Sequence, residues 1–184
     1  MRRTVLAAAL VLAAVTAGAA TLAGVNIPDT MDAAGHKLVL NGAGLRKKLF
    51  IKVYTGALYL PAKSNNPAAI ISADQPRRMV MHFVFDVGKD KIAEAWEEGL
   101  EANTPNASAE VKANFKTLSS WMEEVKDGQE IVLTYVPGTG TTVEVNKKVK
   151  GTLAGKATSD AILATWIGPK PGPGDDFKSA VLGK

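Results

Sequence analysis

The sequence predicts an α+β protein built on a large antiparallel sheet with helices packed on one face. Two observations predict this class. Segments of strand composition fill the first half of the chain and return after residue 130. Between these segments, and again near the C-terminus, apolar residues recur with the three-to-four spacing of amphipathic helices. Strands, adjacent helices, more strands and terminal helices in this order are typical of an α+β domain.

The first half is predicted to be mainly sheet, because it is rich in Val, Ile, Phe and Tyr. Strands are expected at residues 25–28, 37–41, 48–61 and 77–86, with a short helix at 67–72. Within the third strand, Gly56 is expected to mark a kink or bulge that re-aims everything after it. Which tyrosines of that strand share a face therefore depends on this glycine.

The second half is predicted to begin with two helices. The first covers residues 89–102, where apolar residues fall four apart. Thr104 is expected to cap a second helix, with Pro105 in its first turn, that reaches about Val125. Strands are then expected at residues 130–138, 141–146 and 148–153, a helix at 158–166, and a short C-terminal helix after the Pro-Gly segment 168–176.

The first twenty residues have the three parts of a secretory signal: two arginines, an apolar run over residues 5–15, and small residues around Ala19 and Ala20. We expect cleavage after one of these alanines, which leaves a single domain of residues 21–184 in the periplasm or outside the cell. The alternative is a retained membrane anchor, because residues 4–23 are nearly free of charge. We expect no other membrane span.

Composition excludes several classes of function. The chain has no cysteine, which excludes disulfides, thiol nucleophiles, cysteine-zinc sites and iron–sulfur clusters. Of its 22 basic residues two are in the predicted signal, so the mature domain has 20 against 18 acidic ones. This excess is too small for a nucleic-acid surface, and no nucleic-acid partner is predicted.

No familiar catalytic pattern is present: the chain lacks GxGxxG, P-loop, HExxH and GxSxG motifs. His36 and His82 stand in different predicted elements without the spacing of metal ligands. No metal site and no cofactor are therefore predicted, with one exception. His82 has apolar neighbours, which fits either ordinary packing or an axial ligand on one face of a haem.

The segment NGAGLRKKLFIKVYTGALYLP, residues 41–61, contains the candidate site. Gly42 and Gly44 are expected to permit backbone shapes that other residues cannot take, and so to bring Arg46 into an apolar strand. Turned inward, its guanidinium would suit a carboxylate, a phenolate or a polarised carbonyl in an apolar pocket. The alternative is that Arg46 and the two lysines after it form a solvated charge run.

The run GAGLRKKLFIKVYTGALYL resembles the opening segment of chalcone isomerase and chalcone isomerase-like proteins, in which a Gly-x-Gly-x-Arg element precedes a strand with a Gly- and Tyr-containing turn. The tail ILATWIGPKPGPGDDFKSAVLG is similar to the end of the exported bacterial members. The resemblance extends over residues 25–183 in the order of elements. It implies an open-faced β-sandwich, with a ligand cleft between the antiparallel sheet and the helices.

The resemblance also implies site residues. In the plant enzymes, an arginine orients and activates the phenolate and the ketone while a flavanone forms, assisted by a Thr, a Tyr, a Lys and an Asn. Arg46 matches the arginine and Lys91 the lysine, so both are candidate catalytic residues; the threonine falls near Tyr54 and Thr55. The positions of the Tyr and Asn hold Gly and Ala here. Since each lost donor of this kind costs about 10²- to 10³-fold in rate, efficient flavanone formation is not expected.

Three functions are therefore considered. An Arg and Tyr pair without the catalytic donors resembles the fatty-acid-binding branch of the fold, which predicts an exported protein that binds a fatty acid or similar amphiphilic acid around Arg46. Tyr54, Thr55 and Tyr59 complete the expected ligand site. The alternative is an intramolecular lyase or isomerase acting on a phenolic enone. The third is a haem-binding module that uses a histidine.

Overall fold

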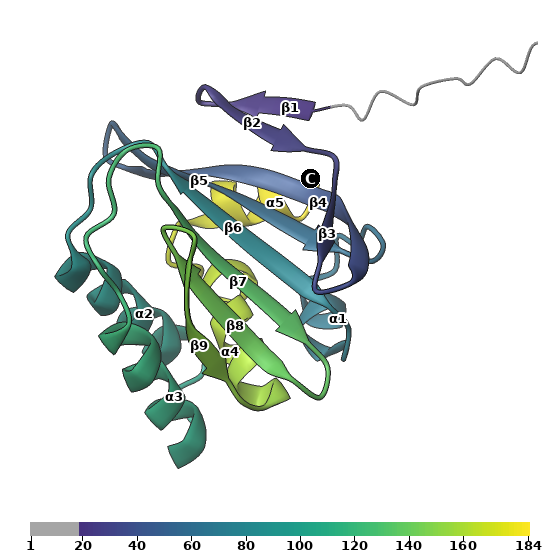
Figure 1. The fold of residues 1–184 in the computed structure, drawn as a ribbon, viewed down its shortest axis with the longest axis vertical. Helices are drawn as coiled ribbons and strands as arrows, with labels where there is room; N and C mark the ends of the chain where they lie inside the picture. The colour runs from purple at the N-terminus through teal and green to yellow at the C-terminus, as the bar shows by residue number, and fades with distance from the viewer. Residues whose placement is uncertain (1–18) are drawn as a thin grey trace, which may run out of the picture.

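The computed structural model describes residues 19–184 and confirms the predicted α+β class (Figure 1). Seven strands form one antiparallel sheet in the order β3-β4-β5-β6-β7-β8-β9, and two more form a separate hairpin, β1-β2. The strands are β1 (Ala19–Leu22), β2 (Val25–Pro28), β3 (Thr30–Ala33), β4 (His36–Lys48), β5 (Ile51–Leu60), β6 (Arg77–Phe83), β7 (Glu130–Val136), β8 (Gly140–Val145) and β9 (Lys148–Leu153). The helices are α1 (Pro67–Ser72), α2 (Lys89–Asn103), α3 (Ala109–Ser120), α4 (Lys156–Ile167) and α5 (Asp175–Val181).

The sheet has an apolar layer on each face. The larger layer lies between the sheet and the helices, and the alternating side chains of β6 that point into it are Met79, Met81 and Phe83. The smaller layer lies on the opposite face, where Val80 packs against a cluster that includes Ile27 of the β1-β2 hairpin. Successive residues of a strand face opposite sides of the sheet, which gives each strand a side chain in both layers in turn. The helices cover one face of the sheet, and the hairpin covers part of the other.

The strand predicted at residues 37–41 is longer than expected, the one predicted at 48–61 begins three residues later, and the two lie closer together than expected. They become β4 and β5, which meet at a tight turn at Leu49 and Phe50. The prediction of a bulge at Gly56 is wrong: Gly56 pairs in regular register with Gly44 on one side and Met81 on the other. The irregularities of this pair of strands lie elsewhere: Asn41 is the extra residue on β4, between Leu40 and Gly42, and Val53 is the extra residue on β5, opposite the step from Arg46 to Lys47.

The prediction for the second helix is wrong at both ends. Thr104 closes the first helix, α2, as predicted, and its backbone N–H bonds to the Leu100 carbonyl, but it does not cap the second helix. Ser108 caps α3: its hydroxyl accepts a hydrogen bond of 3.2 Å from the Val111 N–H. The helix ends at Trp121 rather than at residue 125.

The predicted signal peptide lies almost entirely outside the described residues, and the predicted cleavage point falls at the start of β1. It stays a prediction. Among residues 19–184, the helices are each too short or too polar to cross a bilayer.

Helix α5 lies unusually close to β4 and β5. A Cβ atom at Gly42 would lie 2.2 Å from the Ala180 carbonyl oxygen, and one at Gly56 would lie 2.4 Å from Cζ of Phe177. Neither glycine has a positive φ, so the expectation that Gly42 supplies an unusual backbone shape is wrong. The glycines of these strands are needed because α5 packs directly on the backbone. Asn41 fixes this arrangement by donating to the Val181 carbonyl at 2.8 Å.

Candidate functional site

Arg46 and Tyr54 lie directly opposite each other on β4 and β5, on the face that the helices cover. Arg46 is half-buried, and its Nη1 donates to the carbonyl of Gly172, in the segment that joins α4 to α5. Tyr54 is buried, and its hydroxyl accepts a hydrogen bond of 3.2 Å from the Trp166 indole N–H. Since Trp166 uses only an acceptor lone pair, the tyrosine hydroxyl still has its own hydrogen to donate.

Burial raises the pKa of Tyr54 to about 12, although the hydrogen bond from Trp166 and the charge of Arg46 both act to lower it. The phenol is therefore protonated at neutral pH and acts as a hydrogen-bond donor. A guanidinium and a phenol that donate from adjacent strands are the groups that an anionic oxygen requires. We call Arg46, Tyr54, Trp166 and the Gly172 carbonyl the Arg46 corner.

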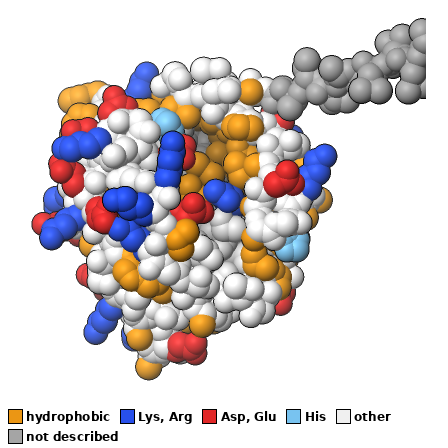
Figure 2. Space-filling model, in the orientation of Figure 1, with side chains coloured by type: hydrophobic (Ala, Val, Ile, Leu, Met, Phe, Trp, Pro, Cys, Tyr) orange, Lys and Arg blue, Asp and Glu red, His pale blue; other side chains and the backbone are white. Residues whose placement is uncertain are grey.

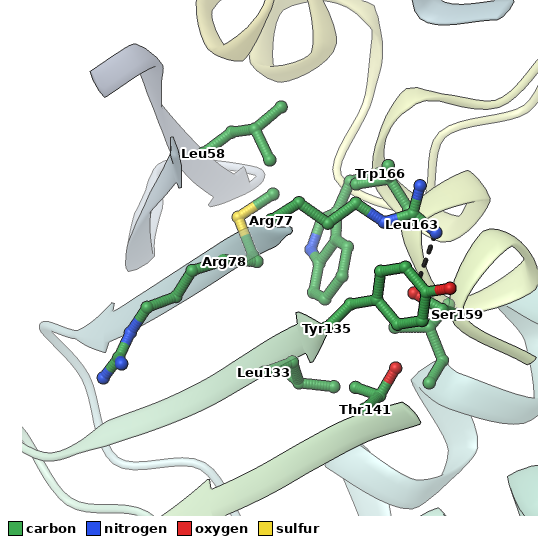
Figure 3. Close-up of a pocket in the computed structure, with 11 residues that line it drawn as sticks. Leu58, Arg77, Arg78, Leu133, Tyr135, Thr141, Ser159, Leu163 and Trp166 are labelled. Carbon is green, nitrogen blue, oxygen red and sulfur yellow. Dashed lines mark hydrogen bonds between the residues drawn. The ribbon is translucent and has the colours of Figure 1, made fainter. Parts of the chain in front are cut away.

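Beyond the Arg46 corner the layer between sheet and helices is apolar. The Tyr54 ring lies 5.4 Å from that of Phe83 and meets Phe177 edge-on at 5.8 Å. Trp166 then leads to a cavity of about 20 Å³ against α4 (Figure 3). That volume holds about one water molecule. A bound acyl chain would therefore have to separate α4 and α5 from the sheet.

The other two expected ligand-binding residues face away from this layer. Thr55 and Tyr59 are buried on the opposite face of the sheet, and Tyr59 donates to the Pro28 carbonyl of the hairpin at 2.9 Å. Both line a cavity of about 260 Å³ between the hairpin and the sheet. Figure 2 shows this region as an apolar hollow below the hairpin with charged side chains at its edge. The four expected residues therefore divide between two faces.

The sequence profile of the chalcone isomerase-like family matches residues 19–183. The chain belongs to this family. Among solved structures, the chain is similar to a fatty-acid binding protein of Arabidopsis thaliana, with a TM-score of 0.69 and 17% identity over 90% of this chain and 96% of that one. Comparison with curated protein sequences gives no match. At this identity the likeness shows the chalcone isomerase-like fold, as the seven-stranded sheet and its packed helices indicate.

Lys91, the second catalytic candidate from the chalcone isomerase resemblance, lies on the exposed side of α2. Its ammonium pairs with Glu94 at 2.6 Å, and both side chains are more than half exposed. The hydrogen bond that Lys91 donates to Glu94 raises the pKa of Lys91, so this side chain is held in the charged form. The same bond is the main cause of the lowered pKa of Glu94, so the two side chains form a surface ion pair outside the apolar layer.

Sequence reasoning did not single out a second arginine, Arg77, that the chalcone isomerase-like fold buries. It donates to Ser159 at 2.8 Å and forms an ion pair of 2.6 Å with Asp160. It also donates to the Ile70 and Ile71 carbonyls at the end of α1, each at 3.2 Å. Figure 3 shows the side chain extending toward Ser159, with Arg78 pointing the opposite way. Arg77 thus joins α1, β6 and α4, and its donors are used within the protein.

The two histidines lie far from the Arg46 corner. His36 is exposed at the start of β4. His82 faces the hairpin side of the sheet and lines the larger cavity, where its Nδ1 lies 3.0 Å from a Glu130 carboxylate oxygen. Among residues 19–184 no group of three or more His, Asp or Glu side chains is placed to hold a metal ion. Haem binding through His82 stays a prediction.

Proposed function

We propose that this protein binds a fatty acid or similar amphiphilic acid, outside the cytoplasm, with the carboxylate at the Arg46 corner. The observation that carries the proposal is the pairing of Arg46, whose guanidinium lies at the solvent-exposed edge of the apolar layer, with a buried, protonated phenol. A carboxylate there would accept charge-assisted hydrogen bonds from Arg46 and one from Tyr54. These bonds would offset the cost of removing the carboxylate from water.

The acyl chain would extend past Trp166 toward the small cavity against α4. Its walls there would include the apolar Leu58, Met79 and Leu163, and the polar Arg77 and Ser159 also line the cavity. Because the layer is closely packed, entry requires α5 and the segment 168–174 to move away from the sheet. One of their attachments to the sheet is the bond from Arg46 to the Gly172 carbonyl, which a ligand carboxylate would replace. The Asn41 bond and the packing of Phe177 on β5 would have to yield as well.

The alternative function, turnover of a phenolic enone, has less support in the geometry. Lys91 is exposed and paired with Glu94, so it does not join Arg46. With a pKa of about 12, Tyr54 is a donor rather than a base at neutral pH. The Arg46 corner therefore favours holding an anion over moving a proton.

The test is palmitate binding, measured by displacement of a fluorescent fatty acid, for the wild type and Arg46→Gln. We expect Arg46→Gln to weaken palmitate binding at least about tenfold, since hydrogen bonds to charged groups contribute about 1.5–3 kcal/mol. Lys47→Gln is the matched control: it removes the same charge from the next, exposed residue and should bind palmitate as the wild type does. Equal palmitate affinity in Arg46→Gln and the wild type would rule out the proposal.

A further inference from the structure

We call the space of about 260 Å³ between the β1-β2 hairpin and the sheet the hairpin cavity. Apolar side chains line its middle, and polar side chains lie at its two ends. Three strands contribute to its floor, and their register places the residues in rows. Ala57, Val80 and Val132 lie side by side in the middle row and are all apolar. Val25 and Ile27 of the hairpin and Met31 of the edge strand β3 complete the apolar lining. A ligand in this space would have an apolar body.

The two ends of the floor are polar and differ in charge. One end has Tyr59 beside Arg78, and the other has Thr55 beside His82 and Glu130. Arg78 and His82 are four residues apart on one strand, which separates their Cα atoms by about 13 Å. Asp29 and Glu144 also lie near the Arg78 end, so an anion would be held there by direct pairing with the guanidinium, and Glu130 would repel it from the other end.

Arg78 is poorly paired within the protein, in contrast to its neighbour Arg77. Its ion pair with Glu144 is long, at 3.6 Å, and its buried Nε has no hydrogen-bond partner among residues 19–184. Its side chain is about one-fifth exposed, so it is partly desolvated as well. A ligand carboxylate at normal hydrogen-bond distance would bind this guanidinium better than Glu144 does.

Tyr59 fixes the hairpin above the Arg78 end. Burial raises the pKa of Tyr59 to about 12, so its hydroxyl stays protonated and continues to donate to the Pro28 carbonyl. Tyr59 and Arg78 are register partners on β5 and β6 and line the same end of the cavity. The cover of the cavity and its cationic end are therefore attached to each other.

From these features we infer that the hairpin cavity is a second ligand site, for a compact monocarboxylic acid whose carboxylate pairs with Arg78 and whose apolar body lies over Val80. The site is independent of the Arg46 corner, from which the sheet separates it. Its volume lies near the lower limit of about 300 Å³ for small-molecule pockets. A long acyl chain would reach the charged Glu130, so the cavity selects short acids.

Methionine methyl groups distinguish the two sites. Met31 lines the hairpin cavity, and Met79 lines the helix-side layer behind the sheet. In protein labelled with ¹³C at the methionine methyls, titration with octanoate should shift the Met31 signal and leave Met79 unchanged. Arg78→Gln should weaken this binding at least about tenfold, because it removes the charged donor.

Two further variants complete the experiment. Val80→Phe fills the cavity from its floor and should abolish the Met31 shift while the remaining spectrum keeps its folded pattern. Lys47→Gln, an exposed charge of the same sign, should leave octanoate binding unchanged. The inference is overturned if octanoate shifts no Met31 signal, or if the shift persists with wild-type affinity in both Arg78→Gln and Val80→Phe. Such a result would leave palmitate binding at Arg46 untouched, so the two proposals fail separately.

Discussion

Replacing Gly56 by alanine tests whether α5 can approach the sheet closely only because glycine has no side chain at this position. The added methyl group would lie 2.4 Å from Cζ and 2.9 Å from Cε2 of Phe177, well inside contact distance. Phe177 is only 1% exposed and packs against Tyr54, so its ring has no free space to enter. Overpacking of this kind costs about 1–3 kcal/mol. Alanine also restricts the unfolded chain, which stabilises the folded state by about 0.4–1 kcal/mol. We therefore expect Gly56→Ala to lower the free energy of unfolding by about 1–2 kcal/mol.

The measurement is urea unfolding followed by circular dichroism at 25 °C, which gives the change in the free energy of unfolding. Phe177→Leu and the double variant complete a double-mutant cycle, in which the two changes should couple favourably by at least about 1 kcal/mol. Gly172→Ala is the control for glycine loss alone, since its methyl group would contact only the Thr165 carbonyl, at 3.7 Å. If Gly56→Ala is as stable as the wild type, or the two changes simply add, the argument for close packing of α5 is refuted.

Three further predictions concern single side chains. Arg77→Met should lower the free energy of unfolding by about 3–5 kcal/mol in urea, because it leaves Asp160 and the α1 carbonyls without their buried partner; a loss below 1 kcal/mol would contradict this. Since burial raises the pKa of Tyr54 from 10 to about 12, only the unfolded chain ionises between these pH values. Stability should therefore be unchanged by this group below pH 10 and fall by about 3 kcal/mol up to pH 12, and Tyr54→Phe should remove that part of the pH dependence. Tyr59→Phe removes the bond to Pro28 and should accelerate amide hydrogen exchange in β2 without changing it in β6; uniform acceleration would contradict a local role.

The class of the fold and most strands could be predicted from the sequence, but two short strands could not. These strands, β1 and β3, each end at an Ala-Gly turn, and the alanines of the two turns, Ala23 and Ala34, take positive φ values of 51°. Hairpin turns of this kind usually carry Asn or Asp at that position, so alanine gives little signal. The hairpin that covers the larger cavity was therefore not predicted, and neither was the cavity.

The candidate site was predicted in part. The Gly-rich segment led to Arg46, and Tyr54 does lie opposite it. The expected bulge at Gly56 obscured the position of Tyr59: in a regular strand, residues five apart face opposite sides, so the two tyrosines belong to different sites. Strand periodicity could likewise predict that Arg77 and Arg78 lie on opposite faces of the sheet. It could not predict which of them is buried, since that depends on where α1 and α4 pack.

The central claim is that an amphiphilic acid lies between the sheet and the helices with its carboxylate at Arg46. A crystal structure of the protein with 16-bromohexadecanoic acid tests it directly, because anomalous scattering locates the bromine at the end of the chain. We expect the carboxylate within hydrogen-bond distance of Arg46 and Tyr54, and the bromine in the helix-side layer beyond Trp166. A carboxylate bound elsewhere, or a bromine on the hairpin side of the sheet, would contradict the account.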